Sequence, residues 1–199
     1  NMKRITKAIF PIAGLGTRFL PQSKVVSKEL IPLGGKPLLH YNIEEAVLSG
    51  IEEIAFITRK NQKEAVDYFK KDENLEQILK ENNKQRELKA LEEINNIAGS
   101  LKIFTYTQKK PTGVANAIFQ AKDFLSKEPC AISFCDDIVD SKIPCLEQLQ
   151  RMFLTCGRPV LALKKMPPER IPNYGIVKVE KIANRFYKIK GVSEKPKIE

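Results

Sequence analysis

The feature that most restricts the fold of this sequence is an alternation of short apolar runs with longer segments of helical spacing. Near-continuous apolar strands separated by helices are typical of a parallel sheet that is buried on both faces. We therefore predict an α/β fold, with a mostly parallel sheet and helices on both faces. The predicted strands are residues 7–13, 53–58, 102–107, 131–135 and 159–164. The predicted helices are residues 37–49, 60–71, 113–126 and 144–155.

The length of 199 residues, 42% of them hydrophobic, predicts one domain over residues 1–199. Residues 74–99 stand apart as a helical excursion, because their apolar positions recur every three or four residues. This excursion packs either on its own domain or on another subunit, and the sequence leaves both options open. Residues 176–179 and 187–192 are predicted to form a strand hairpin.

Composition excludes several classes of protein. The net charge is +10, but basic residues are interspersed with acidic ones and there is no tryptophan, so we expect no nucleic-acid partner. No apolar run has the length of a membrane span, so we expect a cytoplasmic protein without membrane contact. The four cysteines form no CxxC pair and are expected to be reduced thiols. His40 is the only histidine, which argues against a Ser-His-Asp triad and a histidine-rich metal site.

A glycine-rich turn follows the first predicted strand and carries the strongest functional signal. Glycines after a strand allow backbone N–H groups to approach an anion, and an arginine and a lysine bring positive charge to the same loop. The alternative is a tight turn that binds nothing. Arg59 and Lys60, after the second strand, are expected to be surface residues, although they lie at the edge where ligands bind. The residues of the predicted anion site are Ala13, Gly14, Leu15, Gly16, Thr17, Arg18 and Lys28.

The glycine turn does not match the two best-known phosphate loops. The dinucleotide fingerprint needs glycine where Phe19 stands, and the ATPase loop has no match in the chain. The order Gly-x-Gly-Thr-Arg followed by Lys-Glu-Leu-Ile-Pro instead resembles the signature of sugar-1-phosphate nucleotidyltransferases, the bacterial UTP–glucose-1-phosphate uridylyltransferases in particular. This resemblance implies a Rossmann-like nucleotide-diphospho-sugar transferase fold.

The resemblance also implies roles for residues beyond the glycine turn. Asp136 matches a metal ligand, and a carboxylate at the end of a strand suits Mg²⁺, the expected cofactor. Asp137 either contacts the sugar, orients water or caps the next turn. Gln108, Glu29 and Gly113 are implied in nucleotide binding, since a glutamine amide can pair with the edge of a base. The positions implied in sugar binding are Gly175, Glu194 and Lys195, of which Lys195 would also hold the sugar phosphate.

The resemblance implies transfer of a uridylyl group from UTP to glucose 1-phosphate, in a homo-oligomer, with Arg18, Lys28, Asp136 and Lys195 in catalytic roles. Two alternatives remain open: another nucleotide or sugar, such as thymidylyl transfer, and a non-catalytic binder of nucleotide or nucleic acid. Ala115 and Asn116 depart from the family pattern of glycine and histidine. Family members continue past Glu-Lys-Pro, so we expect this chain to lack its C-terminal part and to have impaired activity.

Overall fold

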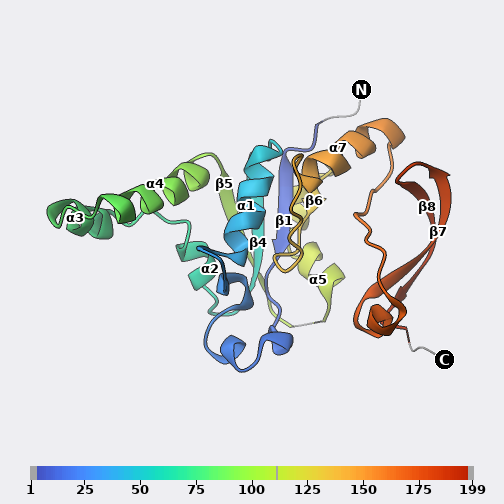
Figure 1. Cartoon of the computed structure of the whole chain (residues 1–199), viewed down its shortest axis with the longest axis horizontal. Helices are drawn as coiled ribbons and strands as arrows, with labels where there is room; N and C mark the ends of the chain where they lie inside the picture. Colours follow the sequence, from blue (N-terminus) through green and yellow to red (C-terminus); the bar gives the residue numbers. More distant parts are fainter. Residues whose placement is uncertain (1–3, 111, 197–199) are drawn as a thin grey trace. The chain divides into compact units, whose positions relative to one another are not determined.

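The computed structural model describes residues 4–110 and 112–196. The chain divides into two compact units, residues 1–160 and 161–199 (Figure 1). The first unit contains the glycine turn and the acidic pair. The second contains a strand hairpin.

The first unit is built on a four-stranded sheet with the order β5-β4-β1-β6. Its strands are β1 (Lys7–Pro11), β4 (Glu53–Arg59), β5 (Lys102–Gln108) and the short β6 (Ala131–Ile132). Every neighbouring pair is parallel. The predicted parallel sheet is confirmed, and the carboxyl ends of its four strands lie at one edge.

Apolar residues of β1 and β4 alternate between two cores, one on each face of the sheet. On one face, Phe10 and Phe56 pack with residues of α1 (Leu38–Leu48), α7 (Cys145–Cys156) and α4 (Gln85–Gly99). On the other face, Ile9 and Ile57 pack with α5 (Val114–Phe119) and α6 (Lys122–Leu125). These strand and helix positions confirm that helices cover both faces (Figure 1).

The predicted helical excursion forms a hairpin of α3 (Glu73–Glu81) and α4, which projects from the sheet (Figure 1). Asp72 caps α3, because its Oδ1 accepts a hydrogen bond of 2.9 Å from the Leu75 N–H. Ile94 and Ile97 of α4 pack against the core, whereas no described side chain of α3 is buried. The homo-oligomer expected from the sequence stays a prediction.

Four predicted elements differ from the structure. The strand predicted at 131–135 shortens to β6, because only Ala131 and Ile132 pair with β1. Residues 159–164 form no strand; Leu161 and Leu163 are about half exposed, and an extended segment becomes a strand only where a neighbour pairs with it. The helix predicted at 60–71 shrinks to α2 (Glu64–Asp67), because Asn61 adopts a left-handed turn with a φ of 65°. The helix predicted at 113–126 is interrupted between α5 and α6.

The loop after β1 contains only short elements. These are the 3-10 helices η1 (Thr17–Phe19), η2 (Gln22–Lys24) and η3 (Lys28–Leu30) and the strands β2 (Pro32–Leu33) and β3 (Lys36–Pro37). The second unit holds η4 (Pro168–Asn173) and the antiparallel hairpin of β7 (Gly175–Ala183) and β8 (Phe186–Glu194), which confirms the predicted hairpin.

The four cysteines all lie in the described part of the chain and are free thiols, as predicted. Within residues 4–110 and 112–196, no helix combines the length and the apolar composition that a membrane crossing requires.

Candidate functional site

Each of the four parallel strands delivers functional side chains or loops to the same edge of the sheet. The glycine turn follows β1, Arg59 ends β4, Gln108 ends β5, and Asp136 lies just after β6. Arg59 and Gln108 are direct partners in the β4–β5 register. The structure therefore confirms that the predicted glycine turn and the predicted acidic pair share one edge, which is where ligands bind in open α/β sheets.

The glycine turn requires glycine at one position in particular. Gly16 has a φ of 64°, and a Cβ atom there would lie 3.0 Å from Cβ of Lys28 and 3.3 Å from Cβ of Ser23. The amides of Leu15, Gly16 and Thr17 donate no hydrogen bond within the described part of the chain. The turn thus packs tightly on the lysine segment and leaves backbone donors open.

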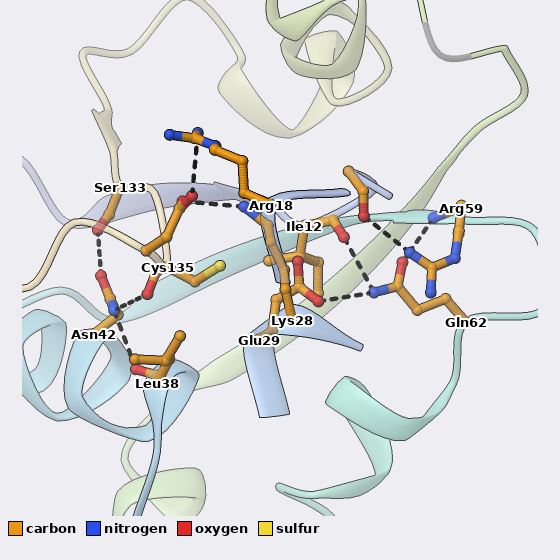
Figure 2. Close-up of polar contacts among 12 residues, drawn as sticks. Ile12, Arg18, Lys28, Glu29, Leu38, Asn42, Arg59, Gln62, Ser133 and Cys135 are labelled. Carbon is orange, nitrogen blue, oxygen red and sulfur yellow. Dashed lines mark hydrogen bonds and ion pairs between the residues drawn. The ribbon is translucent and has the colours of Figure 1, made fainter. Parts of the chain in front are cut away.

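Asp136 forms ion pairs with two of the predicted basic residues, Lys28 and Arg18, whose side chains are labelled in Figure 2. Its Oδ1 lies 3.0 Å from Nζ of Lys28, and its Oδ2 lies 3.9 Å from Nη2 of Arg18. The Lys28 side chain is 14% exposed, whereas the Arg18 side chain is 69% exposed. Burial alone would lower the pKa of Lys28, but the charge that Cys135 carries when ionised, the hydrogen bond that Lys28 donates to Asp136 and the charge of Asp136 together raise the pKa. At neutral pH the Cys135 thiol is protonated, since burial raises its own pKa to about 12, so Asp136 is the partner that matters.

Asp137 lies beside this cluster and has a different environment. Burial, followed by the charge of Asp136, raises the pKa of Asp137, while Lys28 and Arg18 partly oppose this. Among the described residues, no group of three or more histidine, cysteine or acidic side chains is arranged to hold a metal ion. The metal site predicted at Asp136 stays a prediction.

The backbone that leads to Asp136 is fixed by a residue that sequence reasoning missed. Asn42, in α1, donates through Nδ2 to the carbonyl oxygens of Leu38 and Cys135, both at 3.1 Å (Figure 2). Its Oδ1 accepts a hydrogen bond of 3.0 Å from Oγ of Ser133. A buried asparagine on the apolar face of a helix was the available signal, since such an amide needs polar partners.

Glu29 is placed beneath the loop rather than on its surface. Its side chain is fully buried, Oε2 accepts from Nε2 of Gln62 at 3.4 Å, and Oε1 has no partner among the described residues. Burial raises the pKa of Glu29, although its own backbone N–H and the charges of Lys28 and Arg59 act in the opposite direction. The nucleotide contact predicted for Glu29 stays a prediction.

Gln108 presents only one end of its amide. Its Nε2 donates to the Gly113 carbonyl at 3.0 Å and to Oδ1 of Asn116 at 3.2 Å. Gly113, with a φ of 101°, occupies a conformation that favours glycine. Because both N–H donors of Gln108 are occupied, the group left to meet a ligand is the oxygen, a hydrogen-bond acceptor.

The predicted sugar residues lie together in the second unit. Gly175 and Glu194 face each other in the β7–β8 ladder, and a Cβ atom at Gly175 would lie 3.2 Å from Oε2 of Glu194. Lys195 follows directly, its Nζ 3.8 Å from Oε1 of Glu194 and its N–H donating to the Tyr174 carbonyl at 3.1 Å. The structure thus brings these three predicted residues to one end of the hairpin.

Arg59 and Gln62 are the other residues that sequence reasoning missed (Figure 2). Arg59, expected to be a surface residue, is half-buried and donates to the Gly14 carbonyl at 2.9 Å and to Oγ of Ser27 at 3.3 Å. Gln62 is buried and donates to the Ile12 carbonyl at 3.0 Å. The position of Arg59 at a strand's carboxyl end was the signal that could have revealed it.

Known proteins are similar to this chain in sequence and in overall fold. The chain is 38% identical over 196 residues to a UTP–glucose-1-phosphate uridylyltransferase of Staphylococcus haemolyticus, a match that covers 98% of this chain and 67% of that protein. A UDP-glucose pyrophosphorylase solved with UDP-glucose superposes with a TM-score of 0.82 at 32% identity, over 96% of this chain and 69% of the other. The UTP-bound enzyme of Acinetobacter baumannii gives a TM-score of 0.85 at 29% identity, over 97% and 68%.

This chain therefore spans about two thirds of the length of these relatives. The sequence profile described as nucleotidyl transferase matches residues 7–199, which is nearly the whole chain. The glycine turn, the ion pairs of Asp136 with Lys28 and Arg18, and these sequence and structural similarities agree. The chain belongs to the nucleotidyl transferase family.

Proposed function

We propose that the protein transfers a uridylyl group from UTP to glucose 1-phosphate and releases UDP-glucose and pyrophosphate. The observation that carries this proposal is the cluster of Arg18 and Lys28 around Asp136, next to a glycine turn with open backbone amides. Open amides and two cations suit a triphosphate. The names of the relatives, uridylyltransferases and UDP-glucose pyrophosphorylases, support the same substrates.

The reaction needs charge neutralisation and alignment more than proton transfer. A phosphate oxygen of glucose 1-phosphate attacks the α-phosphorus of UTP, the new P–O bond forms, and the bond to the bridging oxygen of pyrophosphate breaks. The attacking phosphate is already anionic, so no general base is required. In this proposal the amides of the glycine turn and the side chains of Arg18 and Lys28 hold the triphosphate and offset its charge.

The acidic pair suits Mg²⁺, our proposed cofactor. Magnesium in nucleotide sites usually takes one or two carboxylates and completes its coordination with phosphate oxygens and water, so Asp136 and Asp137 are a sufficient protein contribution. When bound at these carboxylates, Mg²⁺ would offset the negative charge of the phosphate groups. Asp136 would exchange part of its contact with Lys28 for this role, which frees the lysine to face the phosphates.

We assign sugar binding to the hairpin end of the second unit. Glu194 has a carboxylate that can accept hydrogen bonds from neighbouring hydroxyl groups, and Lys195 supplies a cation for the sugar phosphate. Gly175 keeps the space beside Glu194 free of a side chain. These chemical properties support a hexose phosphate as the acceptor.

The free amide oxygen of Gln108 favours bases with an N3–H group, and it does not distinguish uracil from thymine. An acceptor oxygen suits the N3–H group that uracil and thymine share, and it opposes the acceptor N3 of cytosine. Thymidylyl transfer is therefore the alternative function.

A pyrophosphate-release assay with Mg²⁺ tests the proposal. We expect release with UTP and glucose 1-phosphate, none with CTP, and a smaller rate with dTTP; a larger rate with dTTP would favour the thymidylyl candidate. Titration calorimetry with UTP gives a second readout that does not depend on turnover. Tight RNA binding without UTP binding would overturn the proposal in favour of a nucleic-acid module.

A further inference from the structure

The last residue of β4, Arg59, and Gln62 in the turn that follows send their side chains into the loop that we assign to the triphosphate. We propose that Arg59 and Gln62 are positioning residues, which hold the glycine turn and the lysine segment together in the form that receives UTP. This inference rests on the proposed function for its ligand, and on the hydrogen bonds of the two side chains for its geometry.

Arg59 joins the two arms of the loop. Its Nη1 donates to the Gly14 carbonyl in the glycine turn, and its Nη2 donates to Oγ of Ser27 at the start of the lysine segment. The carbonyl and the N–H of a trans peptide point in opposite directions. Fixing the Gly14 carbonyl on Arg59 therefore turns the Leu15 N–H away from the guanidinium and keeps it available to a ligand.

Gln62 uses both ends of its amide for the same purpose (Figure 2). Its Oε1 accepts from the Arg59 N–H at 3.0 Å, and its Nε2 donates to the Ile12 carbonyl at 3.0 Å. The same Nε2 lies 3.5 Å from Oγ of Ser27 and 3.4 Å from Oε2 of Glu29. Gln62 is only 4% exposed, so water does not replace these partners if the amide is lost.

Together, Arg59 and Gln62 couple the glycine turn to Lys28, the lysine that pairs with Asp136. Ser27 and Glu29, which they contact, flank Lys28, and Lys28 is the residue whose Nζ lies on Asp136. Arg59 also places its positive charge near the buried Glu29. Loosening Arg59 or Gln62 would thus shift both the open amides and Lys28, although neither residue needs to touch the reacting atoms.

The test compares Arg59→Gln, Arg59→Lys and Gln62→Leu with Arg86→Gln, an exposed arginine of α4. We expect Arg59→Gln to weaken UTP binding about tenfold in calorimetry, as loss of a hydrogen bond from a charged group predicts. KM for UTP should rise by the same factor, while KM for glucose 1-phosphate changes less than twofold. Arg59→Lys should recover part of the affinity, and Arg86→Gln should match wild type.

Amide hydrogen exchange of peptides covering residues 14–30 provides a readout that does not involve UTP. We expect faster exchange there in Arg59→Gln and Gln62→Leu, and unchanged exchange in α4. If the wild type binds no UTP while these variants still loosen the loop, the proposed function fails and the loop geometry stands. Wild-type UTP affinity in folded Arg59→Gln would overturn the inference. If Arg59→Gln does not fold, the same measurement is made on Arg59→Lys, and wild-type UTP affinity in that variant would overturn the inference.

Discussion

The carboxyl edge of the sheet and the α3–α4 hairpin both contain pairs of a lysine with an acidic residue, but the lysine is mostly buried at the sheet edge and exposed in the hairpin. In the hairpin, Lys80 pairs with Glu76 one helical turn away, and the lysine is 61% exposed. At the sheet edge, Lys28 pairs with Asp136 from a distant part of the chain, and the lysine is 14% exposed. Exposed pairs contribute little to stability, whereas a buried charge left without its partner is costly. The surroundings of a pair, more than its chemistry, decide what a substitution does.

The sharpest test of this contrast is Asp136→Asn. The change removes the charge that holds Lys28 and Arg18 and that we assign to the metal. Turnover should fall by about 10²–10³-fold, the size reported for loss of one electrostatic transition-state contact. Pyrophosphate release measures it, with the exposed Asp140→Asn as a matched control. Turnover within tenfold of wild type would remove Asp136 from the catalytic assignment.

A second comparison sets Gly16→Ala against Gly99→Ala. At Gly16 the left-handed backbone and the approach of Lys28 should make alanine destabilising by about 1–2 kcal/mol. At Gly99, within α4, an added Cβ meets no atom within 4 Å, so alanine should stabilise by about 0.5–1 kcal/mol. Urea unfolding of both variants measures the change in the free energy of unfolding. Changes of the same sign in the two variants would contradict the expected difference between the two glycines.

Much of the fold was predictable because the strands of a parallel sheet are near-continuously apolar, as in β1 and β4. Glycine spacing and the order of motifs also predicted which residues gather at the sheet edge. The position of Arg59 at a strand end was a usable signal, but the partners of Arg59 and Gln62 were not predictable, because those partners lie 45 and 50 residues away and are backbone carbonyls. Residues 159–164 show the converse limit: apolar composition predicted a strand but does not specify a pairing partner.

The burial of Glu29 leads to a prediction about pH. Its folded-state pKa lies above the usual 4.5, so the contribution of Glu29 to stability is full below pH 4.5 and is lost as pH rises through the folded pKa. Relative to wild type, Glu29→Gln should therefore become more stable as pH rises across that window, by at most about 1.4 kcal/mol per pH unit. Urea unfolding at several pH values measures this difference, with the exposed Glu92→Gln of α4 as control. A difference that stays constant with pH would contradict the buried placement of Glu29.

The smallest effect on stability is expected for a substitution in the α3–α4 hairpin. Glu76→Gln breaks the pair with Lys80 on an exposed helix, so the thermal midpoint should move by less than about 2 °C. Differential scanning calorimetry at low salt measures the shift. A larger decrease in the thermal midpoint would mean that this ion pair stabilises more than the exposed face of α3.

The order of strands in the sheet has a consequence for how the molecule forms. The central β1 is made first along the chain, yet it pairs with β4 and with β6, which arrive after long intervening segments. Pairings between segments so distant in sequence form slowly. Lys28 meets Asp136 only once β6 has docked, so an intermediate that contains β1 and β4 alone carries the glycine turn but lacks the assembled cluster. Nucleotide binding during refolding would accordingly report the docking of β6 rather than the pairing of β1 with β4.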